Sequence, residues 1–136
     1  MKTSVLGKSV LALVFAFICS LAINAASPKS YLYDTKEENG KIVSKVVFLQ
    51  EDGLLSKQIR YEFQYNEAGK VSEKKAYRWD VKSYEWVPFY QITYQYEDQN
   101  GDIKTCYGMW DKKKKDFSLN VQNMVIPSAN YQEIFS

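Results

Sequence analysis

The sequence predicts an all-β fold, an antiparallel meander of six to seven strands that is strongly twisted or curled. Residues 54–65 alternate apolar and polar side chains with a period of two, the pattern of a strand with one buried face. Turns that contain Gly40, Gly69 and Gly101 recur at intervals of about 30 residues, which indicates a repeated unit. After residue 26 no stretch keeps a helical period, so the predicted fold consists of strands.

Turn sequences set the ends of the expected strands. Asn39-Gly40 is a strong hairpin signal, because both residues tolerate the positive φ of a type I′ turn, and Asn100-Gly101 is expected to form a second such hairpin. Pro127 ends the last strand, because proline has no N–H to donate to a sheet. The strands are expected at residues 31–34, 42–49, 54–65, 71–79, 86–96, 103–110 and 117–126.

The strands group into three two-strand units. A tyrosine precedes each Gly-bearing turn, at Tyr33, Tyr65 and Tyr96. The segment from Trp79 to Trp86 matches the segment from Trp110 to Phe117, because in each an aspartate follows the tryptophan and a polar turn leads to a second aromatic residue at the same spacing. We therefore expect these two segments to fold as equivalent hairpins.

The first 26 residues are typical of a signal peptide. Lys2 and Lys8 form a basic start, residues 10–23 form an apolar run too short for a membrane span, and Ala25-Ala26 supplies small residues for cleavage. The mature chain is therefore expected to be exported, to the periplasm or the extracellular space, with no membrane span. A lipid anchor at Cys19 is disfavoured, because this cysteine follows an isoleucine instead of a small residue.

The expected organisation is a signal peptide at residues 1–26, a linker at 27–30, one β-meander domain at 31–127 and a C-terminal tail at 128–136. The tail has enough apolar surface to dock on the sheet, through Tyr131, Ile134 and Phe135.

Composition excludes several classes of function. The chain has no histidine and keeps one cysteine, Cys106, after cleavage, which removes histidine-dependent catalysis, histidine- or thiolate-ligated metal sites and internal disulfides. The formal net charge of +2 falls to zero once Lys2 and Lys8 are removed, which argues against a nucleic-acid partner. Residues 97–102 are rich in oxygen ligands but lack the pattern of an EF-hand calcium loop. We expect no metal, no cofactor and no enzymatic activity.

Several motifs together resemble a known family. They are the Tyr-x-Tyr-Asp sequence at residues 31–34, EAGKV at 67–71, the Trp-Asp pair before a polar turn, and FSLNVQNMVIP at 117–127. In a small exported chain they resemble small secreted proteins of Bacteroides-type gut bacteria that are grouped as a domain of unknown function. The resemblance covers essentially the whole mature chain and brings no catalytic motif. More loosely, the hairpin units are similar to the YD-type repeats of wall and toxin shells, although this chain has too few units to enclose anything.

Aromatic residues supply the candidate site. Aromatic side chains at strand ends can form a platform for sugar rings or for a partner's side chains, but they can also pack across a hairpin and stabilise it by roughly 0.2–1 kcal/mol without a ligand. Both interpretations stay open. The run at residues 87–90 has no counterpart elsewhere in the repeat, so it is a second place to seek specificity. The candidate ligand or partner surface comprises Trp79, Trp86, Phe89, Tyr90 and Trp110.

Three hypotheses about function follow. The first is a non-catalytic binding or interaction module that contacts glycan or an envelope protein through exposed aromatic residues. The second is a structural envelope component, a homo-oligomer whose sheet edges pair with further copies of the chain. The third is a small hydrolase that uses two carboxylates, although the sequence singles out no pair.

Overall fold

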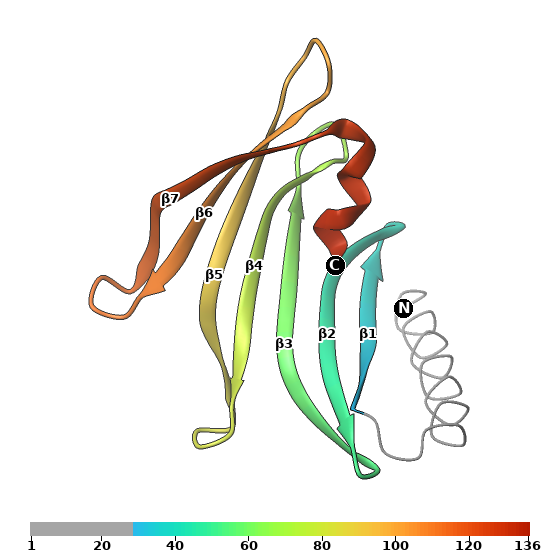
Figure 1. Cartoon of the computed structure of the whole chain (residues 1–136), viewed down its shortest axis with the longest axis vertical. Helices are drawn as coiled ribbons and strands as arrows, with labels where there is room; N and C mark the ends of the chain where they lie inside the picture. Colours follow the sequence, from blue (N-terminus) through green and yellow to red (C-terminus); the bar gives the residue numbers. More distant parts are fainter. Residues whose placement is uncertain (1–28) are drawn as a thin grey trace. The chain divides into compact units, whose positions relative to one another are not determined.

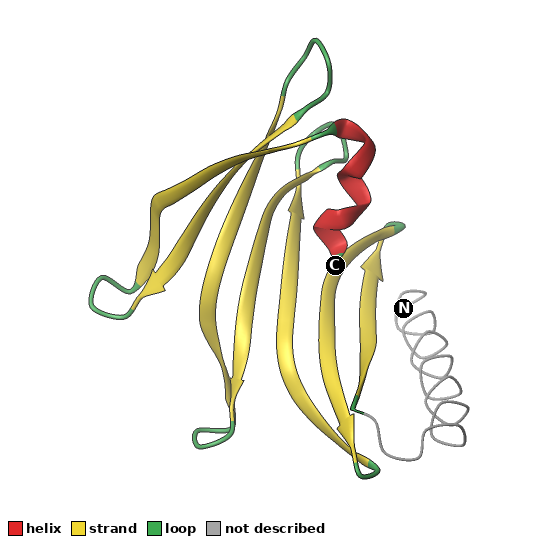
Figure 2. Cartoon of the chain, in the orientation of Figure 1, coloured by secondary structure: helices red, strands yellow, loops and turns green. Residues whose placement is uncertain are grey.

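The computed structural model describes residues 29–136, with the backbone alone for residues 119–123. Seven strands follow one another and pair in the order of the sequence, and neighbouring strands run antiparallel, so the predicted meander is confirmed (Figures 1 and 2). The elements are β1 (Ser30–Glu38), β2 (Lys41–Glu51), β3 (Leu54–Tyr65), β4 (Val71–Asp80), β5 (Glu85–Tyr96), β6 (Ile103–Asp111), β7 (Asp116–Ile126) and the 3-10 helix η1 (Ser128–Phe135). The predicted signal peptide and Cys19 lie outside the described residues.

The Gly-bearing turns show which hairpin predictions are confirmed. Asn39-Gly40 has φ values of 53° and 77° at its two central residues, as a type I′ turn requires. The Asn100-Gly101 hairpin forms, but with a longer turn than predicted: the N–H of Gly101 donates to the Glu97 carbonyl, and φ is positive at Gly101 alone of this dipeptide. The Asn100 side chain instead accepts the N–H of Asp102, which favours the longer turn.

The two tryptophan hairpins have equivalent turns, as the repeat predicts. In the first, the N–H of Tyr84 donates to the Asp80 carbonyl at 2.9 Å, and in the second the N–H of Lys115 donates to the Asp111 carbonyl at 2.8 Å. Each aspartate also accepts, at Oδ1, the N–H of the residue two positions later. Tyr84 and Lys115 have left-handed φ values of 55° and 54°. The shared spacing therefore reflects one turn conformation held by its aspartate.

The described chain forms two compact units. Unit 1 comprises the described residues up to Tyr61 together with Arg78–Trp86, and unit 2 comprises Glu62–Tyr77 and Val87–Ser136. Strands β3, β4 and β5 each contribute residues to both units.

Unit 2 contains most of the fully buried apolar side chains, and η1 supplies part of this core. Ile134 of η1 is 3% exposed, and the Phe135 ring lies 5.2 Å from the ring of buried Phe63, so the docking expected for the tail is confirmed. Burying apolar area of this kind contributes about 25 cal/mol per Å² to stability. The buried apolar side chains of unit 2 are Phe63, Val71, Ala76, Tyr94, Ile103 and Ile134.

Polar contacts hold η1 at its middle and at its C-terminal end. The Val71 N–H donates to the Tyr131 hydroxyl at 3.0 Å, and the Val71 carbonyl accepts the Tyr96 hydroxyl at 2.6 Å. Lys74 is itself buried, and its Nζ donates to the backbone oxygens of Ile134 at 2.8 Å and Ser136 at 2.9 Å. An ammonium group at this end of a helix complements the partial negative charge of its last carbonyls.

Unit 1 buries less. Among its described residues Leu32 is the apolar side chain that is fully buried, while the interior positions of β2 are half-buried throughout. Aromatic and aliphatic side chains of unit 1 therefore stay partly accessible to solvent. This makes unit 1 a candidate contact surface.

Candidate functional site

Unit 1 brings two of the predicted site residues together. The ends of β4 and β5 meet at the Asp80 turn, which places the Trp79 and Trp86 rings 5.2 Å apart, edge to face at 69°. Both side chains are half-buried. Such a pair is worth about 0.5–1.5 kcal/mol beyond the area that it buries, so the contact stabilises the hairpin and leaves part of each ring accessible.

Tyr84 joins this pair from the turn itself. Its ring lies 6.2 Å from the Trp79 ring at 83°, and the residue is 76% exposed. Tyr84 was not among the site residues predicted from the sequence. The signal that could have found it is the comparison of the matched turns, where lysine occupies the equivalent position.

Two cations from β3 lie against the tryptophans. The Lys57 Nζ is 4.2 Å from the centre of the Trp79 ring, and the Arg60 guanidinium carbon is 5.3 Å from that of the Trp86 ring. Both distances fit cation–π contacts, which contribute about 0.5–1 kcal/mol each at exposed sites. We call the set Lys57, Arg60, Trp79, Tyr84 and Trp86 the Trp79 cluster.

Exposed aliphatic residues stand in the neighbouring turns. The β2–β3 and β4–β5 turns lie at the same end of the strands of unit 1 (Figure 1). Leu54, the first residue of β3, and Val81 in the β4–β5 turn are 74% and 69% exposed. Large apolar side chains exposed at the same end as accessible aromatic rings are typical of a surface that contacts another molecule.

The other predicted site residues belong to unit 2. The Phe89 and Tyr90 rings lie 5.1 Å apart, and Trp110 packs edge to face on Phe117 at 5.0 Å, as expected for opposite residues in a hairpin. Phe89, Tyr90 and Trp110 are all half-buried. The predicted set is therefore divided between the units, and cross-strand packing describes Trp110 well.

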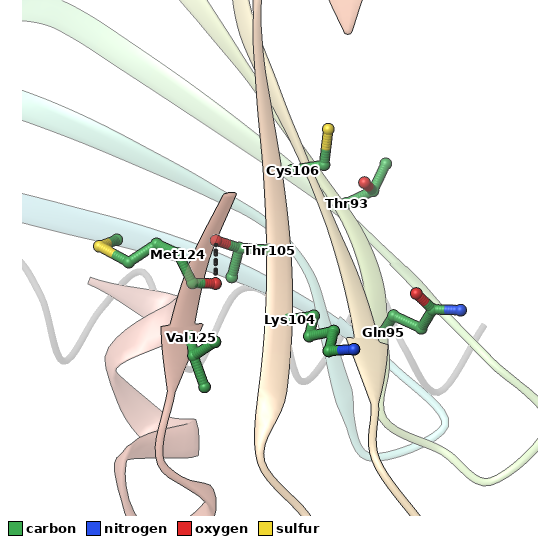
Figure 3. Close-up of a pocket in the computed structure, with 7 residues that line it drawn as sticks. All are labelled: Thr93, Gln95, Lys104, Thr105, Cys106, Met124 and Val125. Atoms are coloured by element: carbon green, nitrogen blue, oxygen red, sulfur yellow. Dashed lines mark hydrogen bonds between the residues drawn. The ribbon is translucent and has the colours of Figure 1, made fainter. Parts of the chain in front are cut away.

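A depression of about 330 Å³, lined by both polar and apolar side chains, lies on β5, β6 and β7 of unit 2 (Figure 3). Figure 3 shows Lys104 beside Gln95 and Cys106 beside Thr93, in keeping with their opposite positions on β5 and β6. Glu97 accepts the Lys104 ammonium at 2.8 Å, and this hydrogen bond raises the pKa of Lys104. Cys106 is a half-buried free thiol, as the sequence indicated. The lining residues are Thr93, Gln95, Lys104, Thr105, Cys106, Met124 and Val125.

A second depression, of about 200 Å³, has a mostly apolar lining. Burial raises the pKa of Tyr94, because it disfavours the charged phenolate. The lining residues are Ile92, Tyr94, Thr105, Tyr107, Met124 and Ile126, and neither of these two depressions is lined by a carboxylate. Burial also raises the pKa of Asp34, which lies on β1 in unit 1.

No group of three or more His, Cys, Asp or Glu side chains placed to hold a metal ion occurs between residues 29 and 136. In the same part of the chain no helix has the length and apolar character needed to cross a membrane.

Comparisons with known proteins give the family. A model described as "Family of unknown function (DUF3836)" matches residues 1–128. The crystal structure of a DUF3836 family protein from Parabacteroides distasonis is 82% identical, with a TM-score of 0.77, over 80% of this chain and 100% of that one. A DUF3836 family protein from Bacteroides vulgatus is 26% identical, with a TM-score of 0.65, over 71% and 97% of the two chains.

A protein of unknown function from Bacteroides fragilis, at 20% identity and a TM-score of 0.63 over 75% of each chain, shares the fold. A comparison with curated proteins gives no match. The resemblance drawn from the sequence motifs is thus confirmed, and the chain belongs to the DUF3836 family of unknown function.

Proposed function

We propose that the protein is an exported, non-catalytic binding module that contacts glycan or an envelope protein through aromatic residues, with the Trp79 cluster as the contact surface. The observation that carries this proposal is Tyr84, a large aromatic residue that is 76% exposed at a left-handed φ of 55°.

The energetics of Tyr84 argue for a role outside folding. A left-handed conformation costs an L-residue about 1–2 kcal/mol, while the edge contact with Trp79 returns about 0.5–1.5 kcal/mol. Any L-residue at this φ bears the same cost, so tyrosine adds to the stability of the turn only the contact with Trp79. The equivalent turn has Lys115 at this position with nearly the same φ, and therefore does not need an aromatic residue.

The composition of the cluster fits a binding hot spot. Trp, Tyr and Arg are the residues most enriched among those whose truncation costs more than about 2 kcal/mol of binding energy. The Trp79 cluster presents all three types, and the half-burial of Trp79 and Trp86 positions their rings before any partner arrives. Preorganised rings lose less entropy on binding.

The non-catalytic part of the proposal rests on chemistry. The chain has no histidine, and neither of the two depressions described above has a carboxylate in its lining. A hydrolase of the carboxylate type needs two acids about 5–9.5 Å apart across a cleft.

A binding screen against envelope glycans and envelope proteins, with residues 27–136 as bait, tests this function. We expect Trp86→Ala and Tyr84→Lys each to weaken binding of the captured ligand at least about thirtyfold, the change that corresponds to the loss of about 2 kcal/mol at a hot-spot residue. Tyr84→Lys copies the matched turn and should leave the fold intact. Trp110→Ala is the control in unit 2. Equal affinity of the wild-type protein and both cluster variants would exclude the Trp79 cluster as the contact.

Association through sheet edges is a second candidate, and exposed apolar residues on the outer strands favour it. Tyr31 on β1 is 58% exposed, and Met124 and Val125 on β7 are 62% and 58% exposed. Long exposed edges of this kind pair readily with other strands. If copies assemble through β7, Val125→Lys should shift sedimentation of the mature chain toward the monomer; a monomeric wild-type protein would remove this candidate.

A further inference from the structure

We propose that the ligand of the Trp79 cluster is an acidic polysaccharide, in which successive sugars each carry a carboxylate or sulfate group. This inference rests on the proposed function and adds the chemical class of the ligand.

The Trp79 cluster contains two pairs of a cation and a tryptophan ring. Lys57 lies over Trp79 and Arg60 lies over Trp86, and the two rings touch at 5.2 Å. The surface therefore presents a cation with an aromatic ring twice, side by side. A polymer whose units repeat a C–H-rich sugar face and an anionic group matches this arrangement unit by unit.

The positive charge of Lys57 lies over the face of the Trp79 ring. The Lys57 ammonium sits 4.2 Å from the ring centre, so a cation already occupies that face of Trp79. A neutral sugar that stacked there would have to displace the ammonium group. An anionic sugar can pair with the cation and contact the ring around it, so the charge contributes to binding.

The charged groups around the Trp79 cluster leave the Lys57 ammonium available to an anion. In the described part of the chain Lys57 contacts the Trp79 ring and forms no ion pair, while two ion pairs elsewhere in unit 1 join Lys29 with Glu51 and Lys36 with Glu38. The Asp80 carboxylate at the start of the turn accepts hydrogen bonds from the Lys82 N–H and the Ser83 hydroxyl.

Titration calorimetry with defined polymers tests the inference. The probes are polygalacturonate for carboxylates, dextran sulfate for sulfates, and methyl-esterified polygalacturonate as the neutral match. We expect wild-type protein to bind at least one acidic polymer, at least about tenfold more tightly than the neutral one, and more weakly as salt is added. Lys57→Met, which keeps an apolar stem over the ring, should lose about tenfold in affinity. Lys112→Met, an exposed lysine of unit 2, should bind like wild type.

The outcomes separate this inference from the proposed function. Equal binding of the esterified polymer, or unchanged affinity of a folded Lys57→Met variant, overturns the acidic ligand. If the wild-type protein binds a neutral glycan and the Trp86→Ala variant does not, the proposed binding function is supported and the acidic ligand is excluded. Preference for polyglutamate or single-stranded DNA over both acidic polysaccharides overturns the polysaccharide class. Binding to none of the polymers overturns the inference, and the screen described above then decides the binding module separately.

Discussion

Replacing Lys74 with methionine tests how η1 is held on unit 2. The Lys74 Nζ donates to the backbone oxygens of Ile134 and Ser136, and hydrogen bonds from charged groups are worth about 1.5–3 kcal/mol each. Ser136 is exposed, so water can replace the lost donor there, whereas Ile134 is 3% exposed and its carbonyl would stay unsatisfied. Methionine also removes the cost of burying an ammonium group, which offsets part of the loss. We therefore expect Lys74→Met to lower the free energy of unfolding by about 3 kcal/mol.

Urea denaturation followed by circular dichroism measures this change, and Lys75→Met is the matched control. The neighbouring Lys75 forms an ion pair with Glu73 at 3.8 Å, and its side chain is 33% exposed. A surface pair of this kind contributes at most about 1 kcal/mol. If Lys74→Met were no less stable than Lys75→Met, the two hydrogen bonds would not anchor η1 and the account of this core would be wrong.

Three further substitutions have defined outcomes. Lys115→Gly should raise the free energy of unfolding by about 0.5–1 kcal/mol in urea denaturation, because glycine adopts the left-handed φ without strain; a loss of stability would contradict that reasoning. Burial raises the pKa of Asp34, so the folded state holds its proton longer and stability falls as pH rises through that pKa. Asp34→Asn should therefore raise the melting temperature at about pH 7 but not at about pH 3, and equal shifts at both pH values would refute this assignment. Tyr96→Phe removes the hydrogen bond to the Val71 carbonyl and should cost about 1 kcal/mol. Burial, with a smaller effect of nearby Tyr131, raises the pKa of Tyr96, so wild-type stability should fall above about pH 10, and this fall should be smaller in the variant.

Local patterns in the sequence predict most of the sheet, because strand alternation and turn chemistry act over a few residues. Asn39-Gly40 adopts the type I′ conformation that its residues favour, and the matched aspartates form matched turns. The longer turn at Asn100 escaped prediction because its side chain competes with the backbone for the N–H of Asp102. The burial of Lys74 was not predicted either, because its hydrogen-bond partners are backbone oxygens of a helix about 60 residues away in the sequence.

The candidate site was predictable only in part. Trp79 and Trp86 stand out in the sequence because tryptophans in matched hairpins are conspicuous, and they do meet. Lys57 and Arg60 belong to β3, and only the folded sheet brings them onto the tryptophan rings. Tyr84 looked like an ordinary turn residue, because a sequence does not reveal how exposed a side chain is or which φ it adopts.

The most direct test of the Trp79 cluster is nuclear magnetic resonance of the three tryptophan indole N–H groups during titration with polygalacturonate. The chain has three tryptophans, and two of them belong to the cluster. The account predicts that the Trp79 and Trp86 signals shift with a common affinity while that of Trp110 stays in place. A shift confined to Trp110, or no shift in any indole while calorimetry reports binding, would contradict it.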